Sequence, residues 1–158
     1  MKKIIFLFVF LFHFCGFAQK TDTQLYESEN YSITMPNTWK ATNDEGIVNI
    51  FPTNQIGAVT ISEYHDLALP KTEIKKFILA LHDSSDDEDK IKSSGGKKGF
   101  NQYVYEYFDE KENLFWLTKV FQKDKELYIV SINCQQKYWN GNYMKVFNET
   151  FDSFKIKK

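Results

Sequence analysis

The residues best suited to acid–base or nucleophilic chemistry are few and far apart in this 158-residue sequence. Beyond residue 18 it contains two histidines, His65 and His82, and one cysteine, Cys134. A histidine beside a cysteine can activate the thiol as a nucleophile, and closely spaced histidines can bind zinc. These residues have neither spacing, and Cys134 ends an apolar run typical of a buried strand. We therefore predict no catalytic residue, no metal ligand and no cofactor, with a reactive Cys134 as the open alternative.

The acidic run Asp83–Asp89 is the strongest candidate for a metal site. Carboxylates that alternate along a loop can supply the oxygen ligands that calcium prefers. An EF-hand loop beginning at Asp83 needs glycine at its sixth position and glutamate at its twelfth, and these positions hold Glu88 and Ser94. The run therefore favours a solvated loop, and calcium binding by Asp83–Asp89 is left as an alternative.

The segment Ser93–Gly99 contains glycines and lysines, as phosphate-binding loops do. Counted from Gly96 and Lys97, that motif requires a glycine where the chain has Ile91 and a serine or threonine where it has Lys98. The segment therefore predicts a flexible turn rather than a nucleotide site.

Three tyrosines, Tyr103, Tyr105 and Tyr107, alternate along one side of a predicted strand. Tyrosine combines an apolar ring with a polar edge, which suits a surface that contacts a partner. We name these three residues as the candidate contact surface. The alternative, which the apolar character of both strand faces favours, is that the rings pack beneath a helix.

The spacing of apolar residues predicts the elements that must position these side chains. Strands are predicted at Tyr31–Met35, from Trp39 onward, and at Ile47–Phe51, Gly57–Tyr64, Phe100–Phe108, Leu114–Phe121 and Leu127–Cys134, with a short closing strand within Phe151–Ile156. Helices are predicted after Pro70, where Ile74, Phe77, Ile78 and Leu81 form one apolar stripe, and over Gln136–Thr150. Residues 19–29 are polar and are expected to be irregular.

The long strands are joined by short polar segments, so neighbours are expected to pair as antiparallel hairpins. Leu114–Phe121 is apolar on both of its faces, which implies that both faces of the sheet are covered. The sequence therefore predicts an α+β fold in a single domain over residues 19–158. Its core is a central antiparallel sheet with helices packed on both faces, an αβα sandwich.

Residues 1–18 have the composition of a secretory signal peptide. Two lysines precede the apolar run Ile4–Phe12, and small residues lead to a cleavage site after Ala18. The run is shorter than the ~20 residues of a membrane-spanning helix. Lipidation at Cys15 is disfavoured because bulky aromatic residues precede it. We therefore expect a periplasmic or secreted protein that is exported in a Gram-negative bacterium and does not span the membrane.

Composition limits the classes of partner. Loss of Lys2 and Lys3 with the leader leaves 18 of the 20 lysines against 21 acidic residues, a net charge of −3. The chain has no arginine, the residue that most often clamps phosphates and reads base edges, which argues against nucleic-acid binding. Because one cysteine remains, no internal disulfide can form, and the core must depend on the packing of aromatic side chains.

The order of these elements and the positions of several aromatic residues resemble the PsbP-like superfamily. The likeness rests on Tyr31-x-Ile33-x-x-Pro36-x-x-Trp39, on the hairpin segments Tyr103-Val-Tyr105 and Leu127-Tyr-Ile-Val130, and on Ser153-Phe154-Lys155. The resemblance implies a central antiparallel sheet with helices on both sides. Roles in that superfamily are mostly docking and scaffolding, and no residue role transfers to this chain.

We therefore predict an exported, non-enzymatic binding or scaffold module that acts by protein–protein contact in the cell envelope. One alternative is a carrier that holds a small apolar or envelope-derived ligand between helix and sheet. The other is a hydrolase whose site is assembled from residues dispersed along the sequence. The expected partner is an envelope protein or a small apolar ligand.

Overall fold

The computed structural model describes residues 22–67, 69–139 and 141–157, so the predicted leader and Cys15 lie outside the described residues. Its strands are β1 (Thr23–Glu27), β2 (Tyr31–Pro36), β3 (Trp39–Asp44), β4 (Ile47–Pro52), β5 (Ala58–Tyr64), β6 (Lys92–Gly95), β7 (Asn101–Asp109), β8 (Leu114–Lys123), β9 (Glu126–Gln135) and β10 (Lys155–Ile156). Its helices are α1 (Ile74–Leu81) and α2 (Asn142–Asp152), with single 3₁₀ turns at η1 (Glu88–Lys90), η2 (Lys97–Gly99) and η3 (Gln136–Tyr138). None of the helices in these ranges has the length and apolar character needed to cross a membrane.

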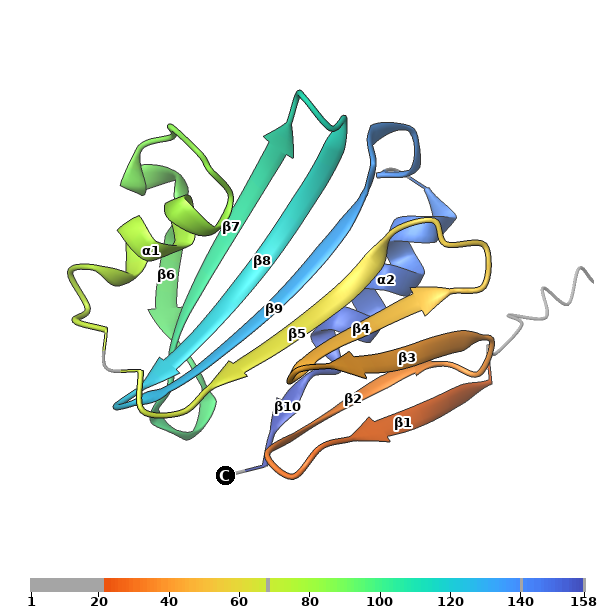
Figure 1. Ribbon diagram of the computed structural model, residues 1–158, viewed down its shortest axis with the longest axis horizontal. Coiled ribbons are helices and arrows are strands. Elements are labelled where there is room, and N and C mark those ends of the chain that lie inside the picture. Colours follow the sequence, from red (N-terminus) through yellow and green to blue (C-terminus); the bar gives the residue numbers. More distant parts are fainter. Residues whose placement is uncertain (1–21, 68, 140, 158) are drawn as a thin grey trace, which may run out of the picture.

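Seven strands form one antiparallel sheet in the order β3-β4-β5-β9-β8-β7-β6 (Figure 1). Each neighbouring pair in that order is antiparallel, and the β7–β8 and β8–β9 hairpins are the longest ladders. The tight β8–β9 turn places Asp124 at a φ of 51°, a left-handed conformation that aspartate tolerates better than most residues. The prediction of an α+β fold built on an antiparallel sheet is therefore confirmed.

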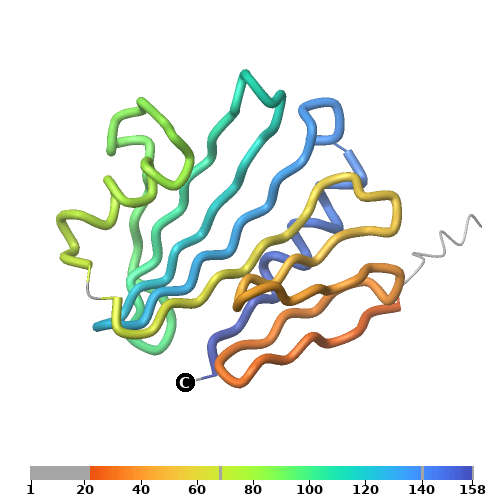
Figure 2. The backbone as a smooth tube through the Cα atoms, in the orientation of Figure 1, coloured from red at the N-terminus to blue at the C-terminus, as the bar shows by residue number. Residues whose placement is uncertain are grey.

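A smaller sheet of three strands, in the order β1-β2-β10, lies beside the edge strand β3 (Figures 1 and 2). The expectation that residues 19–29 are irregular is wrong for β1, which pairs with β2 along its whole length. Along β1 exposed and half-buried side chains alternate, so the strand can be polar and still be paired. The Gln24 side chain also donates to the Trp39 carbonyl oxygen at 3.0 Å, which links the two sheets.

Helix α2 packs on a cluster of aromatic and β-branched side chains. Phe147 is completely buried, and its ring centroid lies 4.7 Å from that of Trp39. The same cluster contains Tyr128, Val130 and Ile132 of β9. These alternate residues share one face of the strand, so α2 covers that face.

Helix α1 packs with the other set of β9 residues. Ile74 and Ile78 are completely buried in a second cluster that contains Leu127 and Ile129. The predicted stripe is confirmed for Ile74 and Ile78, whereas Leu81 at the end of the helix is 44% exposed.

Both helices begin later than predicted. Helix α1 begins at Ile74, because residues 71–73 form turns in which the Glu73 amide donates to the Pro70 carbonyl. Helix α2 begins at Asn142 instead of Gln136, and η3 occupies the first residues of the predicted range. Gly141 precedes α2 with a φ of 97°, a conformation that favours glycine and separates the two segments.

Truncation of Phe147 should test the packing of α2. We expect Phe147→Ala to lower the free energy of unfolding by about 3–5 kcal/mol, because it leaves a cavity against Trp39. Tyr143→Ala, at a position 41% exposed on the same helix, should cost less than about 1 kcal/mol. Urea unfolding followed by circular dichroism measures both, and equal losses would contradict this packing.

Candidate functional site

A row of polar side chains crosses the large sheet in register. Its members face one another directly on neighbouring strands and so share one face of the sheet; they are Thr42, Asn49, Thr60, Ser131 and Thr118. We call them the polar row. Thr60 donates to the Asn49 side-chain oxygen at 2.9 Å, and the hydroxyl groups of Thr118 and Ser131 are 2.8 Å apart. Ser131 and Thr118 are buried, whereas Thr42 at the other end is exposed.

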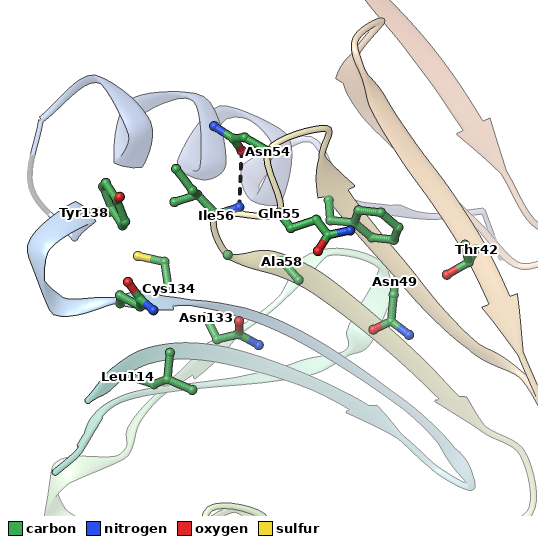
Figure 3. A pocket seen from close by; sticks show the side chains of 13 residues that line it. Thr42, Asn49, Asn54, Gln55, Ile56, Ala58, Leu114, Asn133, Cys134 and Tyr138 are labelled. Atoms are coloured by element: carbon green, nitrogen blue, oxygen red, sulfur yellow. Dashed lines mark hydrogen bonds between the residues drawn. The ribbon is translucent and has the colours of Figure 1, made fainter. Parts of the chain in front are cut away.

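An open groove of about 700 Å³ adjoins the exposed end of the polar row (Figure 3). Its lining comes from β3, β4, β5, the start of β8, the end of β9 and the connecting segments: Thr42, Asn49, Phe51, Asn54, Gln55, Ile56, Gly57, Ala58, Leu114, Asn133, Cys134, Gln135 and Tyr138. Five of these residues carry amide side chains and none carries a charge, although 26% of the chain is charged. We call this hollow the amide groove.

The β4–β5 loop forms one wall of the amide groove and is closely fitted to the sheet. Asn54 accepts a hydrogen bond from the Ile56 backbone amide at 3.2 Å, which tightens the turn (Figure 3). Gly57 has a φ of 76°, and a Cβ atom there would lie 2.5 Å from the Asn133 carbonyl oxygen. Only glycine allows such a close approach, so the wall is held against β9.

The lining of the amide groove can form hydrogen bonds with uncharged polar groups. Asparagine and glutamine side chains both donate and accept hydrogen bonds, so they can pair with polar groups that carry no charge. Phe51 and Tyr138 add aromatic surface to the lining. Among the described residues, no histidine or carboxylate lines the groove to move a proton near neutral pH.

His82 lies at the buried end of the polar row. Its Nε2 atom is 2.9 Å from the Thr118 hydroxyl. The rings of Tyr105, Tyr107 and Trp116 surround it at centroid distances of 5.4 to 5.8 Å. Burial lowers the pKa of the His82 imidazole, because the apolar rings disfavour its charged form. This histidine therefore packs among aromatic rings in an environment that favours its neutral form, and it extends the polar row.

The other two candidates for chemistry have partners of their own. His65 Nε2 lies 3.3 Å from the Asn30 side-chain nitrogen and 3.8 Å from a Glu63 oxygen. Cys134 is buried with its sulfur 3.7 Å from that of Met144, and burial raises the pKa of its thiol to about 11. His65, His82 and Cys134 thus have no common partner among the contacts of the described residues.

The acidic run contacts β7. Asp86 accepts a hydrogen bond from the Tyr105 hydroxyl at 2.9 Å, and the Ser84 hydroxyl is 2.7 Å from the Tyr105 hydroxyl. Within residues 22–67, 69–139 and 141–157, no three side chains of His, Cys, Asp or Glu are grouped as metal ligands. Calcium binding by Asp83–Asp89 therefore gains no support from this geometry.

Burial distinguishes the three tyrosines of the candidate contact surface. Tyr103 and Tyr105 are only 6% and 1% exposed, and they belong to the same apolar cluster as Ile74 and Ile78 of α1. They lie beneath the helix because their side of β7 faces α1, so they form no open surface. Tyr107 is half-buried, and contact between it and a partner stays a prediction.

Two solved structures have the same fold. The solution structure of cyanobacterial PsbP (CyanoP) from Synechocystis sp. PCC 6803 matches with a TM-score of 0.63 and 16% identity, over 90% of this chain and 96% of that chain. A crystal structure from Bacteroides thetaiotaomicron VPI-5482 matches with a TM-score of 0.52 and 14% identity, over 81% of this chain and 45% of that chain. No family model and no curated protein matches the sequence. The predicted PsbP-like resemblance is therefore confirmed for the fold.

The burial of His82 predicts how stability depends on pH. Its folded-state pKa lies below the ordinary value of 6.5, so the unfolded chain binds the proton more readily. Neutral His82 makes its full contribution to the free energy of unfolding above pH 6.5. That contribution is lost as the pH falls toward the lowered folded-state pKa. Between about pH 7.5 and pH 5.5, the free energy of unfolding should fall more in the wild type than in His82→Gln. If the free energy of unfolding changed equally with pH in the two proteins, the lowered pKa of the half-buried His82 imidazole would be contradicted.

The burial of Cys134 predicts an unreactive thiol. With a pKa of about 11, the thiol carries almost no thiolate near pH 8, and its sulfur is also shielded from solvent. Ellman's reagent should leave the folded protein unlabelled and should label one thiol per mature chain after unfolding in urea. Rapid labelling of the folded protein would show an accessible thiol and contradict this assignment.

Proposed function

We propose that the chain is an exported, non-enzymatic binding module of the cell envelope, and that the amide groove holds a protein partner. The observation that carries the proposal is the lining of the groove, which combines five amide side chains with aromatic surface and has no charge. The PsbP-like fold agrees with an accessory or binding role.

The chemistry of the lining favours a segment of polypeptide as the partner. Each backbone peptide unit offers one donor and one acceptor, and the side chains of Asn49, Asn133 and Gln135 can pair with both. A volume of about 700 Å³ is enough for several residues of an extended segment at the open sheet face. Phe51 and Tyr138 supply apolar surface, which raises affinity when it is removed from water.

The two helices give the groove a rigid support. We infer that α1 and α2 cover opposite faces of the sheet, because alternate residues of β9 belong to the two apolar clusters. The exposed Thr42 and the half-buried Asn49 line the groove, and among the described residues its lining includes none from α1 or α2. A rigid site orders few groups on binding, which favours affinity.

Export rests on the sequence of residues 1–18, in particular the lysines, the apolar run and the small residues before Ala18. We propose that cleavage after Ala18 releases residues 19–158 into the periplasm or the medium. An envelope protein is then the class of partner that the module meets.

The alternatives have weaker support. The space between α2 and the sheet is filled by Phe147, Phe151 and Met144, all buried, which disfavours a carrier that holds an apolar ligand there. A hydrolase needs its nucleophile and base within reach of each other, whereas Cys134 contacts Met144 and His82 contacts Thr118.

Site-specific photo-crosslinking tests the proposal. With p-benzoylphenylalanine in place of Phe51, in the groove, irradiation of living cells should produce one discrete protein adduct. The same photoreactive residue in place of Glu149, exposed on α2, should not produce that adduct.

A matched pair of charge variants identifies the adduct with the groove. Asn49→Lys should reduce the adduct yield at least about tenfold, because the contact would bury an unpaired charge. Asn148→Lys, the same change at an exposed position of α2, should leave the yield unchanged. Equal adducts from both photoreactive positions, or no effect of Asn49→Lys, would overturn the proposal.

A further inference from the structure

A second hollow, of about 380 Å³, lies where η2, β8, the end of α2 and β10 meet. These segments are far apart in the sequence, and the turn between β6 and β7 lies close to the C-terminal strand in both views (Figures 1 and 2). Its apolar lining includes Phe121 and Phe154, whose rings are stacked with centroids 5.5 Å apart. Both rings are half-buried, so aromatic surface is accessible inside the hollow.

Positive charge surrounds this aromatic surface. The hollow is lined by four lysines and one carboxylate; they are Lys97, Lys98, Lys119, Lys155 and Asp152. The lining therefore has three positive charges in excess, whereas the whole chain has a net charge of −1. We call this site the lysine hollow.

One of the four lysines is already neutralised. The Lys119 amine forms an ion pair with Asp152 at 2.5 Å and lies 4.3 Å from the centre of the Phe151 ring. Its side chain is 19% exposed, so it is held as part of the wall. Lys119 thus forms part of the wall of the hollow, and its positive charge is balanced by Asp152.

A second lysine is fixed in place without losing its charge. The Lys98 amine donates to the carbonyl oxygens of Ile156 and Lys157 at 3.0 and 2.9 Å. These acceptors are neutral, so the positive charge of Lys98 is not cancelled. Lys97 and Lys155 are exposed at the rim and add two further amines.

We propose that the lysine hollow binds a small organic anion with a flat apolar body, such as an aromatic carboxylate or sulfonate. The apolar body would stack on Phe121 and Phe154, and the anionic group would meet the amines of Lys97, Lys98 and Lys155. Lysine acts as a point charge and lacks the fork geometry of arginine, so carboxylate, sulfonate and phosphate are all acceptable. A volume of about 380 Å³ lies in the range of small-ligand sites.

The probe pair for the test is 8-anilinonaphthalene-1-sulfonate and its neutral analogue N-phenyl-1-naphthylamine, which has the same rings without the sulfonate. Fluorescence titration of the folded protein at low ionic strength should show one sulfonate site per chain. The sulfonate should bind more tightly than the neutral analogue, and its affinity should fall as salt is added.

Charge-reversal variants locate that site. Lys155→Glu and Lys97→Glu should each weaken sulfonate binding roughly fivefold or more, because an attraction at the rim becomes a repulsion. Neither change should alter binding of the neutral analogue. Lys40→Glu, an equal charge change at an exposed position of β3, should leave both affinities unchanged.

Three results would overturn the proposal. The first is equal affinity for the two probes, and the second is an equal effect of Lys40→Glu and Lys155→Glu. The third result is that the protein co-sediments with phosphatidylglycerol vesicles but not with phosphatidylcholine vesicles, and that the sulfonate does not displace it from them. That result would indicate that the hollow binds a membrane surface and not a small anion. The test does not involve the amide groove, so its failure would leave the proposed function standing.

Discussion

Strand β9 has to bury both of its faces, and the rest of the architecture follows from that requirement. The residues from Leu127 to Ile132 are all buried, although neighbours in a strand point in opposite directions. Tyr128 and Val130 therefore need one apolar layer and Leu127 and Ile129 need another. The cluster of Tyr128 and Val130 includes Phe147 of α2, and the cluster of Leu127 and Ile129 includes Ile74 of α1, so each helix removes apolar area of β9 from water. The face of the sheet that carries Leu127 and Ile129 also carries the polar residues Asn133, Thr60 and Asn49. The amide groove lies at this polar part of the face.

The sequence was sufficient for the elements whose pattern is local. Leu114–Phe121 and Leu127–Cys134 have apolar residues on both faces, and Ile74 and Ile78 have helical spacing, so these strands and α1 could be predicted. Strand β1 could not, because its alternation is weak and its pairing with β2 is a tertiary contact. The start of α2 depends on the φ of Gly141, which the spacing of aromatic residues does not report.

The candidate sites depend on register, which sequence spacing does not contain. Asn49, Thr60 and Ser131 are far apart along the chain and become neighbours only when β4, β5 and β9 pair. The alternation of polar and apolar residues in β5, from Val59 to Ser62, was the one available signal. Burial is also not reported by residue type: Tyr103 and Tyr105 were predicted as contact residues, and both are buried in the cluster that contains Ile74 and Ile78 of α1.

Two of the candidate reactive residues are packed into the structure, whereas the lining of the amide groove offers uncharged polar groups. His82 lies among aromatic rings and Cys134 is buried, and we propose that the amide groove acts through hydrogen bonding. Cysteine accessibility in living cells tests this account most directly, with a membrane-impermeant maleimide and with cysteine placed at Thr42 in the groove or at Glu149 on α2. If a partner fills the groove, Thr42→Cys should label in the purified protein and be protected in cells, whereas Glu149→Cys should label in both. Equal labelling of Thr42→Cys in cells and in the purified protein would contradict the account.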